Sequence, residues 1–379
     1  IREKLNGRVS PKKGGHTMES ASQSRQADKA KPSVSIKDIA KEAGVSICTV
    51  SLVMNNKDRN RVSKAVAQRV RGTAQSMGYK PNSVARTLRT SRSYVLGFIT
   101  DEIATTPHAG RVLVGAQEAA RKLGYILLTV NTGNDRELEN QEIAALRQYR
   151  VDGFLYAMMY HRVVEIPAEL EGSPTVVVDG EDENRKIPSI YPDDEMAGYD
   201  ATNRLIQAGC KRIVYYGSSI TIIAQGERFA GYRRALADAG IPFDEQLVVN
   251  VEEATNAASE AGRVFDEIKP DGIFCFNDVR ATFIYEAARE RSVGIGTDVS
   301  VISIDNQPLI TDVLKPALTT LELPHYEMGF EAVHQLVAMI DDGAATESLA
   351  RSEDSIRRSE NGPMTPLRCR IIERDSIVS

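Results

Sequence analysis

The sequence predicts a small all-α helix-turn-helix head joined to a larger α/β body with two lobes. Apolar residues recur at helical spacing within residues 34–80, and strand-like and helix-like segments alternate from residue 94 onward. Residues 1–93 carry 20 Lys and Arg against 6 Asp and Glu, whereas residues 94–379 carry 27 against 46. The formal net charge of −5 therefore conceals a basic head on an acidic body. This asymmetry predicts a polyanionic partner for one end only.

Residues 1–33 are expected to form a disordered basic tail, because they are rich in Lys, Ser, Gly and Gln. No apolar segment follows the basic residues, so no secretory signal is predicted. No stretch approaches the ~18–20 consecutive apolar residues of a membrane span, so no membrane partner is predicted. The four cysteines are far apart and form no CxxC pair, which argues against a local zinc motif and fits a reducing cytoplasm.

Residues 34–80 are predicted to form three short helices, each preceded by a residue that can cap it. These capping residues are Ser35, Ser46 and Ser63. Asp38 completes a capping box in the first helix, and Gly44 ends that helix. The tight turn between the first two helices predicts a helix-turn-helix, although any packed helical pair fits the same pattern. The 12 basic against 3 acidic residues in positions 34–93 favour DNA binding.

Two segments of the chain resemble the head and the hinge of the lactose-repressor (LacI/GalR-type) family of bacterial transcription regulators. The head motif is residues 36–46 (IKDIAKEAGVS) followed by residues 49–51 (TVS), and the hinge motif is residues 78–89 (GYKPNSVARTLR). Two such motifs at this separation are specific to the family. The resemblance extends over residues 34–379.

The resemblance implies that the second helix enters the major groove of DNA. Three apolar side chains would then read the bases, namely Ile47, Cys48 and Leu52. The family more often has polar residues at the first two sites and Arg at the third. Apolar side chains make no bidentate hydrogen bonds to bases, so they are expected to contact thymine methyl groups or simply to exclude water. Thr49 and Ser51 are expected to contact phosphates. A core role is the alternative for the apolar residues, but Val50 and Val53 already supply the inward face.

Residues 81–93 are expected to be a hinge helix and linker, because the family's hinge becomes helical only on DNA. The DNA contacts implied in this region come from Tyr79, Asn82, Arg86, Leu88 and Arg89. Leu88 matches the residue that the family inserts into the minor groove, where it bends the duplex. A lone Leu in a basic helix is ordinarily a packing residue, but no core is evident beside this one.

The body, residues 94–379, begins with a run of alternating strands and helices. The expected strands are residues 94–100, 125–131, 153–158 and 175–179, then 212–217, 272–277 and 299–304. This alternation predicts parallel sheets flanked by helices, and the two successive series predict two similar lobes with a ligand cleft between them. Residues 349–363 are polar and are expected to form an irregular loop or a lid-like insertion before a final strand at 368–373.

Polar residues at the ends of several strands predict a binding site in that cleft. They are Asn131, Asp179, Asn277 and Asp305. Any one alone is more simply a turn residue or helix cap, but together they suit a polyhydroxyl ligand. The resemblance implies an effector domain similar in fold to periplasmic sugar-binding proteins, and adds Asp193 and Arg228 to its site. It also places His108 where the family has an aromatic ring over the ligand. A surface arginine and an exposed loop histidine are the alternatives.

The sequence predicts a regulator and not an enzyme. There is no GxGxxG, Walker A or GxSxG motif and no pairing of a nucleophile with a base, and the five histidines show no metal spacing, so no cofactor and no metal are predicted. We expect a DNA-binding transcriptional repressor controlled by a sugar bound between two lobes. The alternative is a cytoplasmic α/β sugar-binding or sugar-processing protein. The expected partners are a near-palindromic double-stranded operator, the effector, and a second copy in a homodimer or larger assembly, in the bacterial cytoplasm with the nucleoid.

Overall fold

In the computed structural model the chain forms two compact units, residues 1–82 and residues 83–379. The structure describes residues 34–54, 58–79, 92–106, 109–252, 255–341, 357–359 and 362–378. We call the first unit the head and the second unit the body. Among the described residues, no helix combines the length and the apolar character needed to span a membrane.

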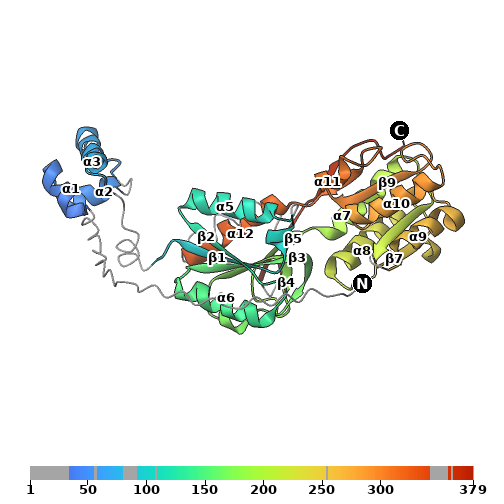
Figure 1. The fold of residues 1–379 in the computed structure, drawn as a ribbon, viewed down its shortest axis with the longest axis horizontal. Helices are drawn as coiled ribbons and strands as arrows, with labels where there is room; N and C mark the ends of the chain where they lie inside the picture. Colours follow the sequence, from blue (N-terminus) through green and yellow to red (C-terminus); the bar gives the residue numbers. More distant parts are fainter. Residues whose placement is uncertain are drawn as a thin grey trace, which may run out of the picture. The chain divides into compact units, whose positions relative to one another are not determined.

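The head consists of the three predicted helices, α1 (Ile36–Ala43), α2 (Ile47–Met54) and α3 (Lys64–Ser76) (Figure 1). The capping box is confirmed, because Ser35 Oγ accepts a hydrogen bond from the Asp38 backbone and Asp38 bonds back to the Ser35 backbone. Gly44 ends α1 with a φ of 62°, a left-handed conformation that glycine adopts without strain. Local sequence signals therefore set where these helices begin and end.

The buried residues of the head are all apolar. They are Ile39, Ala40, Ala43, Val50, Val53, Ala67, Val70 and Ala74. The two valines of α2 are fully buried, as predicted for its inward face. A core this small leaves the head dependent on its caps and turns.

The first lobe of the body is built on a seven-stranded sheet with the order β11-β12-β5-β4-β3-β1-β2. All neighbours are parallel except β11 and β12, which are antiparallel. In chain order the strands are β1 (Val95–Thr100), β2 (Ile126–Asn131), β3 (Gly153–Val164), β4 (Thr175–Asp182), β5 (Ser189–Pro192), β11 (Arg357–Ser359) and β12 (Gly362–Leu367).

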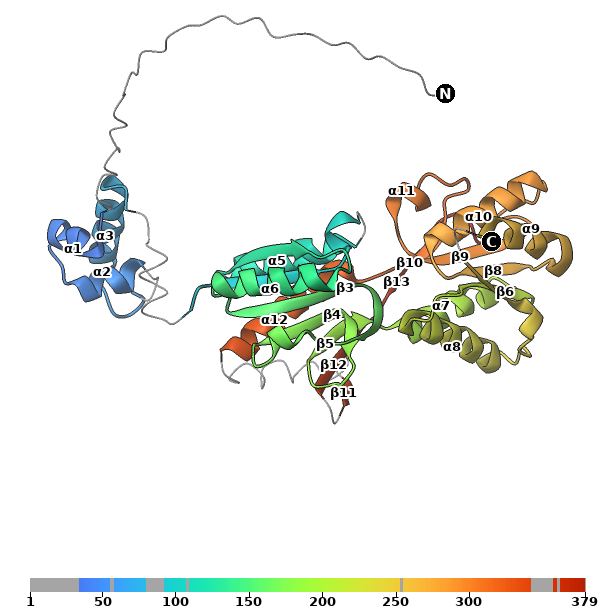
Figure 2. The ribbon, with the colours of Figure 1, turned by 60° about the horizontal axis from the view of Figure 1, so that its bottom comes forward.

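Helices cover both faces of this sheet (Figure 2). On one face, α5 (Arg111–Leu123) packs against α12 (His325–Ile340), and both contribute to one apolar core. On the other face, α6 (Arg136–Gln148) contributes Ile143 and Leu146 to a separate core. The first lobe is thus a three-layer sandwich, as the alternation of strands and helices predicted.

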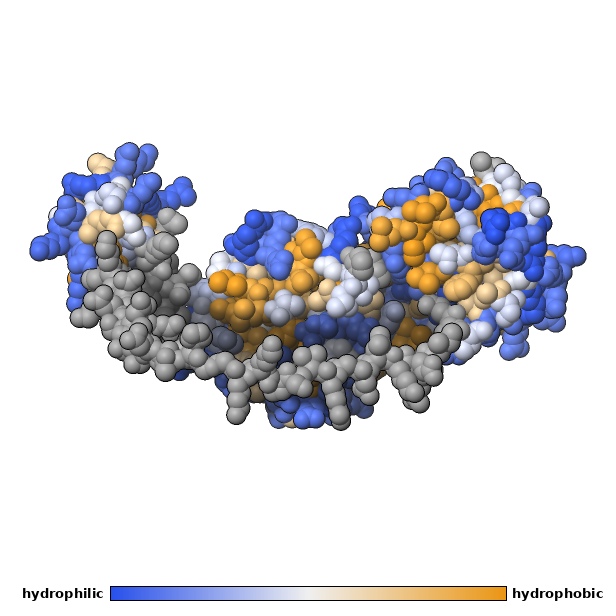
Figure 3. Space-filling model, in the orientation of Figure 1, coloured by the Kyte–Doolittle hydropathy of each residue, from blue (hydrophilic) through white to orange (hydrophobic). Residues whose placement is uncertain are grey.

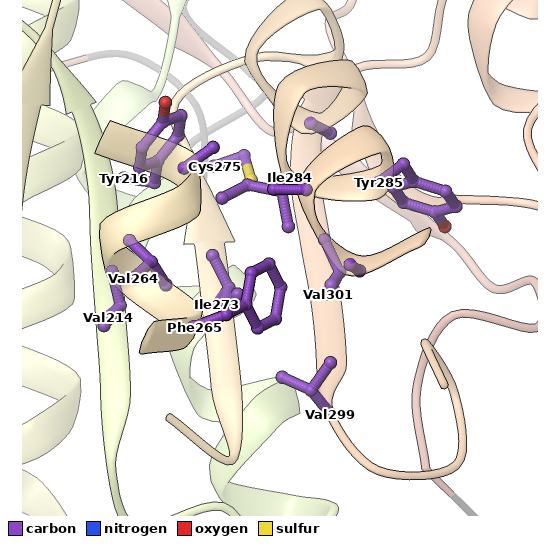
Figure 4. Close-up of a cluster of buried hydrophobic side chains, with 14 of the residues drawn as sticks. Val214, Tyr216, Val264, Phe265, Ile273, Cys275, Ile284, Tyr285, Val299 and Val301 are labelled. Atoms are coloured by element: carbon purple, nitrogen blue, oxygen red, sulfur yellow. The ribbon is translucent and has the colours of Figure 1, made fainter. Parts of the chain in front are cut away.

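The second lobe has a six-stranded sheet with the order β13-β10-β9-β8-β6-β7, parallel apart from β13. Its strands are β6 (Ile213–Ser218), β7 (Val248–Val251), β8 (Gly272–Cys275), β9 (Ser300–Asp305), β10 (Thr319–Glu322) and β13 (Arg370–Ile372). Its helices are α7 (Asp194–Gln207), α8 (Ile223–Asp238), α9 (Ala257–Arg263), α10 (Asp278–Glu290) and α11 (Pro308–Thr311). Figure 4 shows the core beneath α10, where Ile284 of the helix lies over the sheet residues Ile273 and Val301.

The two lobes are not successive segments of the chain, which corrects the expectation of two successive series. The chain enters the second lobe between β5 and α7, returns to the first between β10 and α12, and crosses again between β12 and β13. The prediction of an irregular loop at 349–363 is also wrong in part, because β11 and the start of β12 lie within it. Pairing of β12 with β5 of the first lobe adds backbone hydrogen bonds that composition does not reveal.

Close helix crossings in each lobe depend on pairs of glycines. In the first lobe, a Cβ on Gly115 would lie 2.0 Å from the Tyr326 carbonyl oxygen, and one on Gly329 would lie 1.9 Å from the Val112 carbonyl oxygen. In the second lobe, a Cβ on Gly198 would lie 2.1 Å from the Arg228 carbonyl oxygen, and one on Gly231 would lie 2.0 Å from the Glu195 carbonyl oxygen. Glycine therefore lets the backbones of α7 and α8 approach at the residue expected to bind the effector.

Candidate functional site

The second helix of the head presents the side chains expected to read DNA. Ile47 is 51% exposed and Cys48 is also exposed, so these two apolar side chains are available for contact. Ser46 Oγ accepts a hydrogen bond from the Thr49 backbone at 3.1 Å, which fixes the start of the helix. Thr49, Ser51 and Leu52 are half-buried. The buried face of the helix, with Val50 and Val53, contributes to the core, whereas the exposed face, with Ile47 and Cys48, lies outside the core.

Part of the predicted DNA interface lies outside the described residues. Tyr79 packs against the core of the head, and it is the last residue described before the hinge. Four further predicted contacts lie outside the described residues, namely Asn82, Arg86, Leu88 and Arg89. His108, predicted for the effector site, also lies outside them. The roles of all five remain predictions.

A polar cavity of about 280 Å³ lies between the two lobes of the body. We call it the inter-lobe cavity. The first lobe lines it with Glu102, Thr106, Met159, Tyr160, His161, Asp179 and Pro192, and α12, which packs on that lobe, adds His325. The second lobe and its connections line it with Asp194, Ala224, Arg228, Phe276, Asn277, Val279, Asp305, Gln307 and Leu323. It lies at the carboxyl ends of parallel strands, the usual ligand position in such sheets.

An irregularity in β3 brings first-lobe residues into the cavity. The pairing of β3 with β4 jumps from Ala157 opposite Val178 to Arg162 opposite Gly180, so four residues of β3 bulge out beside Asp179 alone. Three of these four residues line the cavity, namely Met159, Tyr160 and His161. Bulges of this kind redirect side chains beside binding sites. The sequence pattern predicted that this strand ends at Met158, and the three residues lie beyond that point.

A chain of buried charges connects the lobes beside the cavity. Arg228 Nε donates to Asp194 Oδ1 at 2.7 Å, and Asp194 Oδ2 lies 3.0 Å from His161 Nδ1. His161 Nε2 in turn lies 3.3 Å from Glu181 Oε1. Arg228 also donates to the Phe276 carbonyl oxygen at 2.7 Å, and its guanidinium carbon lies 4.5 Å from the centre of the Phe276 ring. Asp194 therefore pairs with the guanidinium of Arg228 through one carboxylate oxygen and with the imidazole of His161 through the other.

The protonation of this cluster follows from burial and from its neighbours. Burial lowers the pKa of His161, but Asp194 and Glu181 more than offset this and raise the pKa to about 10. Burial would raise the pKa of Asp194, but the charges of Arg228 and His161 hold it below its ordinary value. The imidazole is therefore charged at neutral pH and donates from both ring nitrogens.

Two further carboxyl groups of the cluster are poised near neutrality. Burial raises the pKa of Asp179 to about 7, and the charge of His161 opposes that rise. Burial raises the pKa of Glu227, on α8, to about 7 in the same way. Asp179 is 4% exposed, and its Oδ1 has no hydrogen-bond partner among the described residues. A buried acceptor without a partner, aimed at a cavity, suits a ligand that donates a hydrogen bond.

The donor set His161, Asp194 and Glu227 is of the kind that can ligate a transition metal. One ligand atom from each lies within 4.8 Å of the other two. Both nitrogens of His161 already face carboxylates, however, and a protonated imidazole has no free lone pair for a metal. In this arrangement the two ring protons of His161 lie between the imidazole and the carboxylates of Asp194 and Glu181.

The structure brings together four of the predicted effector residues and leaves others apart. Asp179, Arg228, Asn277 and Asp305 all line the inter-lobe cavity. Asp193 instead accepts a hydrogen bond from the Met196 backbone and caps α7, and its neighbour Asp194 lines the cavity. Asn131 is exposed at the end of β2 and is not among the cavity residues.

Two of the four cavity residues have additional structural roles. Asn277 caps α10 by accepting from the Arg280 backbone at 3.0 Å, which is the simpler role weighed for it. Arg228 is buried in the second turn of α8, so it is not the surface residue of the alternative interpretation. Residues that sequence reasoning missed are Tyr160, His161, Asp194, Phe276, Gln307 and His325. The nearest signal was Asp194, which directly follows the predicted Asp193.

Comparison with known proteins gives two matches that together span most of the chain. Residues 35–82 match the family described as bacterial regulatory proteins, lacI family, and residues 93–360 match periplasmic binding proteins and sugar binding domain of LacI family. The HTH-type transcriptional regulator RegA of Clostridium saccharobutylicum is 31% identical over 81% of this chain and 92% of its own length. The sucrose operon repressor of Escherichia coli is 30% identical over 82% of this chain and 96% of its own.

Solved structures agree with these matches. The crystal structure of a putative LacI-family transcriptional regulator from Rhizobium etli is 29% identical, with a TM-score of 0.65. That similarity covers 76% of this chain and 100% of the other.

Proposed function

Because the chain belongs to the LacI family of bacterial regulatory proteins, which are DNA-binding transcriptional regulators, we propose that a carbohydrate in the inter-lobe cavity controls its operator affinity as a repressor. The observation that carries this proposal is the cavity itself, where Arg228, Asn277, Asp305 and Asp179 converge from both lobes. Oδ1 of Asp179 has no hydrogen-bond partner among the described residues. Planar amide, carboxylate and guanidinium groups pair well with adjacent hydroxyls. A ligand that touches both lobes can change their relative orientation.

A thermal-shift screen tests the effector proposal directly. We expect one or a few members of a panel containing sucrose, cellobiose, ribose and xylose to raise the melting temperature, because a ligand at 100 times its Kd adds ~2.7 kcal/mol to stability. Asp179→Asn should reduce that shift while leaving the ligand-free melting temperature nearly unchanged, since the two side chains are isosteric. Asn131→Ala, outside the cavity, is the matched control. A panel of sugars that produces no shift at any concentration would contradict the proposal.

The proposed DNA partner is a near-palindromic operator, read by α2 and by the hinge. In vitro selection from a random duplex library should yield two half-sites about one helical turn apart, since a symmetric dimer reads both. Leu88→Ala should weaken specific binding and leave most salt-dependent non-specific binding intact, because wedging adds specificity while phosphates supply non-specific affinity. Selection that returns no consensus, or equal specific affinity for the variant, would count against these assignments.

We also propose that the chain forms homodimers through α5 and the edge strand β2 of the first lobe. Three large hydrophobic side chains are exposed there, namely Val114, Leu123 and Ile126. Figure 3 shows hydrophobic surface on the visible face of this lobe. An unpaired edge strand with exposed apolar residues favours association. Ile126→Glu should shift the sedimenting species from dimer to monomer, and an unchanged sedimentation coefficient would contradict this surface.

The proposed location is the bacterial cytoplasm, together with DNA, and no catalytic turnover is expected. The relatives reported above are named as regulators and repressors. Incubation of the protein with each sugar that shifts its melting temperature, followed by chromatography of the sugar, tests this expectation. Consumption of the sugar would favour the sugar-processing alternative.

A further inference from the structure

We propose that His161 is a positioning residue that forms a buried ionic bridge between the two lobes. Through this bridge, the position of Arg228 in the second lobe favours one orientation of the first lobe. The inference rests on the proposed function, because it concerns regulation at the same inter-lobe cavity. His161 is linked to Arg228, the arginine proposed to bind the effector, through Asp194. The role assigned to His161 is therefore to couple the position of Arg228 to the relative orientation of the lobes.

The bridge joins elements of different lobes through a single carboxylate. His161 lies on β3 of the first lobe, whereas Asp194 begins α7 of the second. Asp194 Oδ2 lies 3.0 Å from His161 Nδ1, while Oδ1 accepts from Arg228 at 2.7 Å. The Asp194 side chain is fully buried, so water cannot readily replace either partner. Separation of the lobes would leave this carboxylate short of one cation.

His161 is held firmly on the first-lobe side of the bridge. Its Nε2 lies 3.3 Å from Glu181 on β4. Its ring stacks on Tyr191 of β5, with ring centres 4.3 Å apart and an interplanar angle of 18°. Contacts to two strands of one sheet fix the ring orientation, so His161 moves with the first lobe. Asp194 and Arg228 belong to the second lobe and move with it.

The charge on the ring is what makes the bridge complete. A neutral imidazole has one donor and cannot serve Asp194 and Glu181 together, whereas an imidazolium serves both. The titratable and charged groups facing the ring come from four elements: Asp179 and Glu181 on β4, Tyr191 on β5, Asp194 on α7, and Glu227 on α8. His161 opposes the rise in pKa of both Asp179 and Glu227. Loss of its charge would therefore raise the pKa of both carboxyl groups further and favour their protonated forms.

This arrangement gives the cavity a reciprocal link to lobe orientation. A ligand that holds Arg228 and Asp194 in their present positions also favours the contact between Asp194 and His161. A lobe orientation that breaks that contact disfavours the same ligand. The link is physical and local, because it runs through one shared carboxylate.

Two ligand-free measurements test the bridge with His161→Gln. The first is the pH dependence of unfolding by urea. Because the pKa of His161 in the folded chain, about 10, exceeds its ordinary value of 6.5, the stabilisation is complete below pH ~6.5 and is lost as the pH rises toward 10. The wild-type chain should lose stability across this window, and the variant should lack that component. An identical pH profile for both chains would overturn the proposal.

The second measurement is the distance between the lobes by electron–electron double resonance. Spin labels at Tyr149→Cys and Leu309→Cys occupy exposed sites on the first and second lobes, in a chain that also carries Cys48→Ser to remove the exposed native thiol. Dilution with unlabelled chain limits the signal to distances within one chain. We expect a narrow distribution with His161 present and a broader or shifted one with Gln. An unchanged distribution would overturn the proposal.

Glu181→Gln provides a second variant should His161→Gln fail to fold. It keeps the contact with Asp194 and removes one of the carboxylates that favour the charged ring. We expect the pH at which stability is lost to move down by about 1–3 units, the usual effect of one nearby opposite charge. No downward movement would contradict the bridge. Neither measurement uses a sugar, so a failed effector screen and a failed bridge are distinguishable.

Discussion

The head and the body place their charged residues in opposite ways. Within its described residues the head buries only apolar side chains, and its basic residues face solvent. The body buries Arg228, Asp194 and His161 together, each less than 5% exposed. In the head, folding and recognition therefore use different residues. In the body these three residues serve both folding and recognition, so substitution of any of the three should change stability and ligand response together.

Asp194→Asn should produce the largest effect, and Asp58→Asn in the head is its counterpart. Removal of one partner from a buried ion pair costs ~3–5 kcal/mol, because the remaining charges stay buried and unpaired. Asp58 pairs with Arg71 at 2.9 Å, but the arginine is half exposed, and such pairs contribute only ~0–1 kcal/mol. Urea unfolding of each variant measures the difference. Equal losses in the two variants would remove the contrast between head and body.

Gly231→Ala should be the next most damaging change. Its Cβ would lie 2.0 Å from the Glu195 carbonyl oxygen, so α7 and α8 must separate, at a cost of ~1–3 kcal/mol or more. Gly226 is on the same helix with nothing within 4 Å of its Cβ position, and Gly226→Ala should stabilise by ~0.5–1 kcal/mol. Melting temperatures that move in the same direction for both variants would show that the helix crossing does not depend on glycine.

Ser35→Ala should weaken only the head. Loss of the helix cap costs ~1 kcal/mol, which corresponds to an opening equilibrium constant of the three helices that is about fivefold larger. Hydrogen exchange read by mass spectrometry reports head and body peptides separately in the full chain. Ser76→Ala, an exposed position at the end of α3, serves as the control. Faster exchange in body peptides would argue against the independence of the two units.

Ile47→Ala should have the smallest effect on stability and a clear effect on DNA. An exposed side chain contributes within ~0.5 kcal/mol to folding, whereas Val50→Ala, on the buried face of the same helix, should cost more than ~1 kcal/mol. Binding to the selected operator, measured by fluorescence anisotropy, should fall for Ile47→Ala at unchanged fraction folded. Unaltered affinity would exclude Ile47 from base contact.

Sequence patterns predicted the head more completely than the body. The helix ends lie at the predicted capping residues Ser35, Ser63 and Gly44. These ends are predictable because a cap bonds to a backbone group only a few residues away. Most strands of the body also match their predicted cores, although β3 continues past Met158 to Val164. The pairing of β12 with β5 depends on residues more than 170 positions apart, and no local pattern contains it.

The sequence by itself determined the helix caps, the alternation of strands and helices, the division of charge, and four polar residues of the cavity. Only the tertiary structure decided that His161 faces Asp194 and Glu181, that Asp194 and not Asp193 lines the cavity, and that the two lobes are interleaved along the chain. The physical reason is range. Capping and periodicity are settled within a turn of helix or a single strand, whereas a buried charge is stable only where distant elements supply its partners.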